Sequence, residues 1–277
     1  MPVAGGRTCR KGGPDVDAIA MIFCFSATGN SRWVAGELAR HLSDQVVDIS
    51  DCLRRRSLPA GLAGAARVGV VFPIHGWHVP APVGRFLRML SAGLPGAAYR
   101  YAVCTCGDDV GKGLAGLRRF LGFGAVWTVA MPNTYVPMFA LDSPEVASGK
   151  IAAARRRLAA VAGDVLACRP AWEVREGGFP RLKTYVLHPL FRLYVRLRPV
   201  REGGGCNGCG RCVRLCPVDN LRLSAGPPVF LGHCIHCMAC VHGCPQAALS
   251  SGGSARRGQY RLEETLRLCP PAEGGNK

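Results

Sequence analysis

Eight cysteines near the end of the chain stand in two copies of one spacing, and this spacing is typical of metal ligation by sulfur. The segment CNGCGRCVRLCP at 206–217 returns as CIHCMACVHGCP at 234–245. Soft thiolates select iron–sulfur clusters, zinc or Cu(I). Three cysteines at steps of three, followed by a fourth cysteine and a proline, are typical of proteins with two 4Fe–4S clusters.

In that arrangement the fourth cysteine of each run ligates the cluster of the other run. The sequence therefore predicts one cluster on Cys206, Cys209, Cys212 and Cys244. It predicts the second on Cys234, Cys237, Cys240 and Cys216. Zinc is the plain alternative, and it fits poorly because zinc sites normally use two separated C-x-x-C pairs.

Three further segments, each directly after an apolar run, carry residues that could bind a phosphate and a planar ring. The first, Ser26-Ala27-Thr28-Gly29-Asn30-Ser31, offers hydroxyls and backbone N–H groups ahead of a helix, although such a turn is also an ordinary helix cap. The second, Pro73-Ile74-His75-Gly76-Trp77, offers an aromatic plane. The third is Thr105-Cys106-Gly107-Asp108-Asp109.

The elements that position these segments follow the pattern of βαβ units and a parallel sheet. Expected strands are Ala20–Phe25, Val46–Ile49, Val68–Phe72, Tyr101–Thr105 and Val126–Met131, and expected helices are Ser31–Leu42, Ala81–Leu90, Lys112–Leu121 and Glu145–Leu166. Ligands of such sheets bind outside the carboxyl ends of the strands, at a topological switch point. The loops after the first, third and fourth strands occupy those positions.

On these residues the chain resembles flavodoxin, whose phosphate loop reads [ST]-x-T-G-x-[ST], fused to a bacterial-type two-cluster ferredoxin. The resemblance covers about residues 20–250 and is to the flavodoxin–ferredoxin fusion electron carriers of anaerobic bacteria. It implies a doubly wound five-stranded parallel sheet of order 2-1-3-4-5, followed by a small α+β ferredoxin module. It also implies FMN, with its phosphate on Ser26, Thr28, Gly29, Asn30 and Ser31. The remaining FMN contacts would come from Pro73, His75, Gly76, Trp77, Thr105, Cys106, Gly107 and Asp108.

This interpretation predicts an electron-transfer protein, and no catalytic residue is assigned because no Ser/His/Asp set or carboxylate pair stands out. The loop after the fourth strand lacks the second ring-covering aromatic of many flavodoxins, and Asn133-Thr134-Tyr135 is a candidate for that cover. Two alternatives stay open. One is an FMN and iron–sulfur oxidoreductase that reduces a small acceptor such as a quinone, and the other is a redox sensor without flavin.

The organisation along the chain is predicted as five parts. Residues 1–19 form a disordered extension, 20–168 the flavodoxin-like domain, 169–205 a connector, 206–250 the ferredoxin-type domain and 251–277 a tail. Within the connector, Tyr185–Leu197 is apolar and aromatic with interspersed arginines, which fits packing on a domain or, alternatively, a helix on a membrane surface.

The charge and composition narrow the function classes. The chain carries 35 Lys and Arg against 18 Asp and Glu, a formal net charge of +17, which favours acidic redox partners. No nucleic-acid-binding signature accompanies this charge. No apolar run reaches the length of a transmembrane span and no secretory signal is evident, so a cytoplasmic location is predicted.

Overall fold

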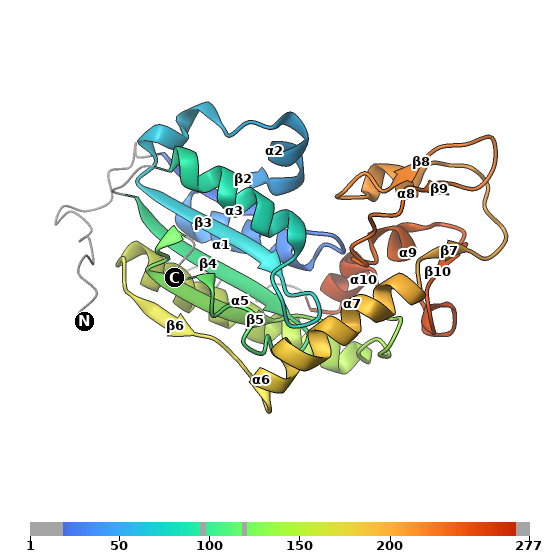
Figure 1. Ribbon diagram of the computed structural model, residues 1–277. Helices are drawn as coiled ribbons and strands as arrows, with labels where there is room; N and C mark the ends of the chain where they lie inside the picture. Colours follow the sequence, from blue (N-terminus) through green and yellow to red (C-terminus); the bar gives the residue numbers. More distant parts are fainter. Residues whose placement is uncertain (1–18, 95–97, 118–120, 270–277) are drawn as a thin grey trace.

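The structure is a computed structural model and describes residues 19–94, 98–117 and 121–269. The predicted extension at 1–19 therefore lies almost wholly outside the described residues. The larger part of the chain is an α/β domain around one parallel sheet of order β2-β1-β3-β4-β5-β6 (Figure 1). The strands are β1 (Ala20–Cys24), β2 (Gln45–Asp48), β3 (Arg67–Pro73), β4 (Tyr99–Cys106), β5 (Ala125–Ala130) and β6 (Ala171–Glu173).

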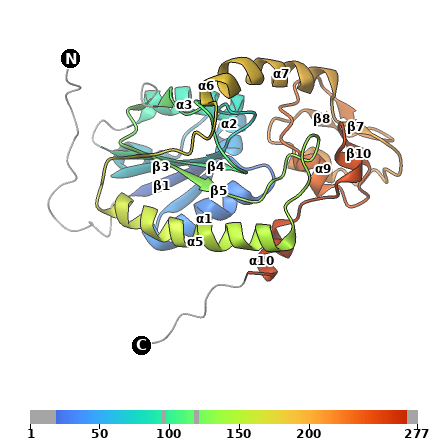
Figure 2. The same cartoon turned by 90° about the horizontal axis from the view of Figure 1, so that it is seen from below.

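Helices cover both faces of this sheet, as the near-continuously apolar central strands require. The helices α1 (Asn30–Leu42) and α5 (Pro144–Leu166) lie on one face, and α2 (Ile49–Arg55) and α3 (Ala81–Gly93) lie on the other (Figure 2). The first layer buries Trp127, Tyr101 and Leu38, and the second buries Phe23 and Phe86. The expected flavodoxin-like order 2-1-3-4-5 is confirmed.

The structure differs from expectation in three elements of this domain. The short strand β6, which lies in the predicted connector, pairs in parallel with β5 and adds a sixth strand. The helix α2 after β2 was not expected. Residues 111–116 form successive turns where the first part of the helix at 112–121 was predicted, whereas Leu117 and Leu121 are helical and 118–120 lie outside the described residues.

The connector forms a helical ridge from α6 (Pro180–Leu182) through a π-helical turn (Lys183–Leu187) to α7 (His188–Leu197). Proline cannot donate the backbone hydrogen bond of a helix interior. Pro189 is tolerated because it stands in the first turn of α7, directly after the wider turn. The proline therefore marks a change of helix type rather than the end of the helix.

The cysteine-rich module is a pair of similar halves with its own small core. Each cysteine run ends in a five-residue helix, α8 (Arg211–Leu215) or α9 (Ala239–Gly243), and these two helices pack together. Two antiparallel pairs complete it, β7 (Arg201–Glu202) with β10 (Leu249–Ser250) and β8 (Leu221–Arg222) with β9 (Val229–Phe230).

The tail returns to the α/β domain. After a 3-10 turn (Ser254–Arg256), α10 (Leu262–Arg267) packs against α5, and Leu262, Leu266 and Cys269 join the core on that face. One further 3-10 turn, Ala60–Gly64, precedes β3. Residues 251–269 thus connect the module back to the sheet domain.

Candidate functional site

The eight cysteines of the two runs surround two separate hollows in the C-terminal module. The first hollow is lined by Cys206, Cys209, Cys212 and Cys244. The second is lined by Cys234, Cys237, Cys240 and Cys216. Each hollow thus takes three cysteines from one run and the fourth cysteine of the other run.

The space between the sulfurs bears on which metal fits. Four thiolates on a single zinc ion lie about 2.3 Å from the metal and close the space between them. A hollow ringed by four cysteines suits a cube of iron and sulfur better than a single ion.

Burial makes these thiols costly to ionise without a metal. It raises the pKa of Cys237 to about 12, and it raises the pKa of Cys240 further. Thiolates are the ligands of iron–sulfur clusters, so cluster cations must offset this cost. Backbone N–H groups add to that stabilisation, since Asn220 N–H donates to Cys216 Sγ at 3.2 Å and Ala248 N–H donates to Cys244 Sγ at 3.3 Å.

The two cysteine runs differ in how they form the same loop. In both runs the backbone enters the left-handed region twice, at Gly208 (φ 72°) and Gly210 (φ 67°) in the first run. The second run has His236 (φ 56°) and Met238 (φ 63°) at these places. Side chains there cost about 1–2 kcal/mol each, so both must make contacts that glycine could not.

His236 makes those contacts with groups outside the cysteine run. Its Nδ1 accepts from Tyr135 Oη at 2.7 Å, and its Nε2 donates to the Arg198 carbonyl at 2.9 Å and lies 3.0 Å from Ser251 Oγ. Burial lowers the pKa of His236, in agreement with a neutral ring that uses both nitrogens. The Cys234 to Cys240 run is thereby fixed against the loop that follows β5.

The predicted phosphate loop, residues 26–31, lies at the carboxyl end of β1, where the structure leaves several donors without partners. Gly29 caps α1 with φ 100°, no side chain caps this 13-residue helix, and its first turn holds no acidic residue. The hydroxyl of Ser26 is buried and has no hydrogen-bond partner. Free N–H groups at a helix start and an unpartnered hydroxyl suit a phosphate group.

Two other side chains of this loop are already occupied. Asn30 is buried, its Nδ2 donates to the Pro132 carbonyl at 2.9 Å, and its Oδ1 accepts from Tyr260 Oη at 2.7 Å. Ser31 Oγ lies 2.8 Å from Thr105 Oγ1, a hydrogen bond between the first and third loops. These side chains hold the loop in shape, and the backbone with Ser26 and Thr28 remains for a ligand.

The second loop is a tight turn enclosed by the connector. His75 and His78 exchange backbone hydrogen bonds around Gly76 and Trp77, both of which have positive φ. His188 Nδ1 donates to the Gly76 carbonyl at 2.7 Å, and the Phe191 ring leaves no room for a Cβ at Gly76. Pro73 precedes the turn at the end of β3.

The third loop, residues 105–109, presents mainly backbone groups to a ligand. Thr105 and Cys106 are buried at the end of β4, whereas Gly107 is half-buried and Asp108 is exposed. The Cys106 thiol turns inward, 3.6 Å from the Asp108 carbonyl, and burial raises its pKa to about 12. Cys106 is therefore a packing residue here. The buried Cys24 and Cys104 fit the same description.

Tail and loop residues that sequence reasoning did not single out link the phosphate loop to the cysteine module. His242 Nε2 donates to the Thr134 carbonyl at 2.8 Å, and His242 Nδ1 accepts from the Tyr260 N–H at 3.0 Å. The same Tyr260 reaches Asn30, and Leu262 lies against Gly29. The predicted site loops and the cysteine module therefore share one boundary.

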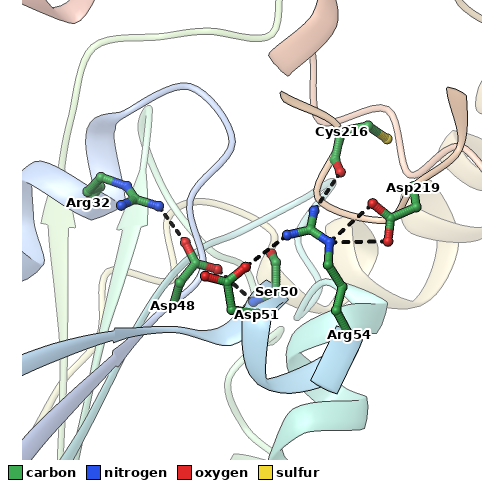
Figure 3. Close-up of polar contacts among 7 residues, drawn as sticks. All are labelled: Arg32, Asp48, Ser50, Asp51, Arg54, Cys216 and Asp219. Carbon is green, nitrogen blue, oxygen red and sulfur yellow. Dashed lines mark hydrogen bonds and ion pairs between the residues drawn. The ribbon is translucent and has the colours of Figure 1, made fainter. Parts of the chain in front are cut away.

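A second connection between the two parts uses Arg54 on α2 (Figure 3). Its guanidinium donates to Asp219 at 3.1 Å, to Asp51 at 3.0 Å and to the carbonyl of Cys216 at 3.0 Å. Burial lowers the pKa of Arg54, but the two carboxylates outweigh it and the net shift is upward. An always-charged arginine thus contacts the backbone of a predicted cluster ligand.

Comparison with known families finds one match. Residues 205–249 match the family described as a 4Fe-4S dicluster domain, which covers all eight cysteines of the two runs. Comparison with curated proteins finds no match. No helix in the described part of the chain is long and apolar enough to cross a bilayer.

Several solved structures are similar to part of this chain at low identity. A rubredoxin:oxygen oxidoreductase from Desulfovibrio gigas is 18% identical over 53% of this chain, with a TM-score of 0.41, and the chain spans 35% of that protein's length. An FMN-dependent NADH-azoreductase from Bacillus anthracis, solved with FMN, is 10% identical over 53% of this chain and 99% of its own, with a TM-score of 0.37. The fold assignment rests on the strand order of this chain, not on these likenesses.

Proposed function

We propose that this chain is an electron-transfer protein that carries two 4Fe–4S clusters in its C-terminal module and FMN at the edge of its sheet. The observation that carries the proposal is the pair of hollows, each ringed by four cysteines of interleaved runs. Clusters of this kind transfer single electrons, and a flavin accepts one or two. Residues of this chain supply the binding, the spacing and the exclusion of water.

In this proposal the FMN phosphate binds the start of α1. The uncapped N–H groups after Gly29 and the unpartnered Ser26 hydroxyl are its donors, and Thr28 adds a second hydroxyl. Asn30 and Ser31 hold the loop through Tyr260 and Thr105. The ring lies between the Gly76-Trp77 turn and the Gly107 backbone.

The exposure of the cysteines supports an order for the two clusters. Cys209 is exposed, so an acidic partner protein can approach it. Cys234 is partly covered, and its neighbour His236 bonds Tyr135 beside the sheet edge. The cluster of the first run is therefore the contact for the partner, and the cluster of the second run lies on the flavin side.

Cofactor analysis of protein prepared without oxygen tests the proposal. We expect about eight iron atoms and about one FMN per chain. Iron near zero with stoichiometric zinc would overturn the cluster part. Eight irons without a yellow chromophore that acid releases would overturn the flavin part and favour a flavin-free sensor.

The interleaving has its own test in Cys216→Ala, with Cys269→Ser as the control. Cys216 lines the second hollow, so in this proposal the change should disturb the cluster of Cys234, Cys237 and Cys240 and leave the other intact. Iron content should fall to about half, and one of two electron paramagnetic resonance signals should change. Loss of the signal that depends on Cys206 instead would refute the assignment.

A further inference from the structure

The helical ridge of the connector exposes a continuous row of large apolar side chains. Leu182, Val186, Leu190, Leu193 and Leu197, which we call the outer stripe, follow one another at steps of three or four residues and are between 48% and 66% exposed. Phe179 and Tyr185 beside them are 81% and 65% exposed. Such spacing places the side chains on one face of a helix.

The opposite face of the ridge is packed, so the orientation of the outer stripe is fixed. Thr184 is buried and accepts from the Lys112 N–H at 2.8 Å, while His188 and Phe191 contact the Gly76 turn. The Phe191 ring also packs near the Tyr135 ring, with centroids 5.4 Å apart and the ring planes tilted by 60°. The stripe is therefore the face left over after the ridge has bound the α/β domain, and no described segment of the chain covers it.

Charge along the ridge has only one sign. Between Gly177 and Arg201 the sequence holds no Asp or Glu. Arg181, Arg192, Arg196 and Arg198 are exposed, and the one nearby lysine, Lys183, is paired with Asp109. The apolar row is thus bordered by arginines whose charge is not neutralised on the ridge itself.

The ridge is also placed where a flat surface can reach it. Figure 2 shows α6 and α7 along the outer edge of the molecule, on the side of the sheet that carries α3. A convex ridge with an apolar stripe and a basic border matches an in-plane helix at a lipid interface. Pairing with a second helix in a protein groove would not need an exclusively basic border.

We propose that the outer stripe and its arginines bind the surface of an anionic phospholipid bilayer. The stripe enters the boundary between headgroups and acyl chains, and Arg192 and Arg196 bind the headgroup phosphates. The inner face of the same helix contacts the Gly76 turn. Bilayer binding thus places the proposed flavin loops about one helix diameter, roughly 10 Å, from the lipid surface.

Vesicle flotation with the full chain, loaded with its clusters, tests this proposal. Wild type should float with vesicles of phosphatidylcholine and phosphatidylglycerol, and should bind phosphatidylcholine vesicles at least about tenfold more weakly. Binding to the anionic vesicles should fall as salt is raised, because screening weakens the arginine contribution. If the wild-type protein stays unbound in the presence of the anionic vesicles, the proposal is overturned. The finding that this face binds an acidic protein instead of lipid would also overturn it.

Matched variants distinguish binding through the outer stripe from nonspecific adsorption of exposed apolar side chains to the vesicles. Leu190→Glu with Leu193→Glu should weaken binding by at least about tenfold. Val146→Glu with Leu166→Glu changes two similarly exposed residues of α5, on the other side of the sheet, and should bind as wild type does. Equal binding by both pairs overturns the proposal. Cluster absorbance and circular dichroism check that each variant is folded.

The arginines have a separate readout. Arg192→Glu with Arg196→Glu should abolish the preference for anionic vesicles, while the apolar side chains of the outer stripe stay unchanged. Both side chains are exposed, so the fold does not depend on them. A double variant that keeps the wild-type preference would refute the assigned role of these arginines. Because vesicle binding is measured without turnover, this outcome is independent of the proposed flavin.

Discussion

The hydrogen bond between Tyr260 and Asn30 offers a quantitative test of how the tail holds the phosphate loop. Both residues are 7% exposed, and the bond joins positions 230 residues apart in the chain. Tyr260→Phe keeps the packed ring but leaves Asn30 Oδ1 buried without its donor. An unsatisfied buried acceptor costs about 1–3 kcal/mol. In a chain of this size this corresponds to a fall of roughly 2–12 °C in the unfolding midpoint.

A double-mutant cycle with Asn30→Ala separates this bond from other losses, since Asn30 also bonds the Pro132 carbonyl. We expect a coupling free energy of about 1 kcal/mol or more between the two positions from anaerobic urea unfolding. FMN affinity should fall in Tyr260→Phe, because Asn30 is part of the loop that presents the proposed phosphate donors. Strict additivity, with coupling below about 0.3 kcal/mol, would refute the view that the tail stabilises this loop.

Three further changes have expected outcomes. Arg54→Met should lower the unfolding free energy by less than about 1 kcal/mol, because its ion pairs are partly exposed, and a larger loss in urea unfolding would contradict this. Burial lowers the pKa of His75 from 6.5 to about 4, so stability should fall as pH drops from about 6.5 toward 4, by at most about 3 kcal/mol. His75→Gln should reduce that pH dependence in urea unfolding, and an unchanged pH dependence would contradict the assignment. Gly29→Ala should destabilise by about 1–2 kcal/mol at φ 100° and weaken FMN binding, while Gly36→Ala, with open space around it, should be neutral or stabilising.

Elements with local signals were predictable from the sequence. The central strands are apolar runs bounded by loops, and the first and last long helices begin next to Gly29 and Ser143. The predicted ends of these strands and helices therefore lie within two residues of their ends in the structure. The strand β6 was not predicted, because three residues are too few to show the alternation of apolar and polar side chains that marks a strand. The expected helix at 112–121 is apolar in the right places, but its first residues form turns, and Thr184 of the connector binds the Lys112 N–H there.

The residues that join the two parts were not predictable by periodicity. Arg54 and Asp219 are 165 positions apart, and nothing in the local sequence of either marks the pair. Tyr260 lies in a polar tail without a core of its own, and its role depends on where Asn30 is placed by β1. Contacts of this kind arise from the folded arrangement, so only the structure reveals them.

One signal in the sequence did bear on this boundary, and it lies in the comparison of the two cysteine runs. Where the first run has Gly208 and Gly210, the second has His236 and Met238, although both runs need a left-handed backbone there. Two such side chains cost about 2–4 kcal/mol of strain. The hydrogen bonds of His236, at about 0.5–1.5 kcal/mol each, and the full burial of Met238 offset a cost of this size. A departure from glycine in one copy of a repeat therefore indicates which copy lies against the rest of the protein, and here it indicates the run beside the sheet edge.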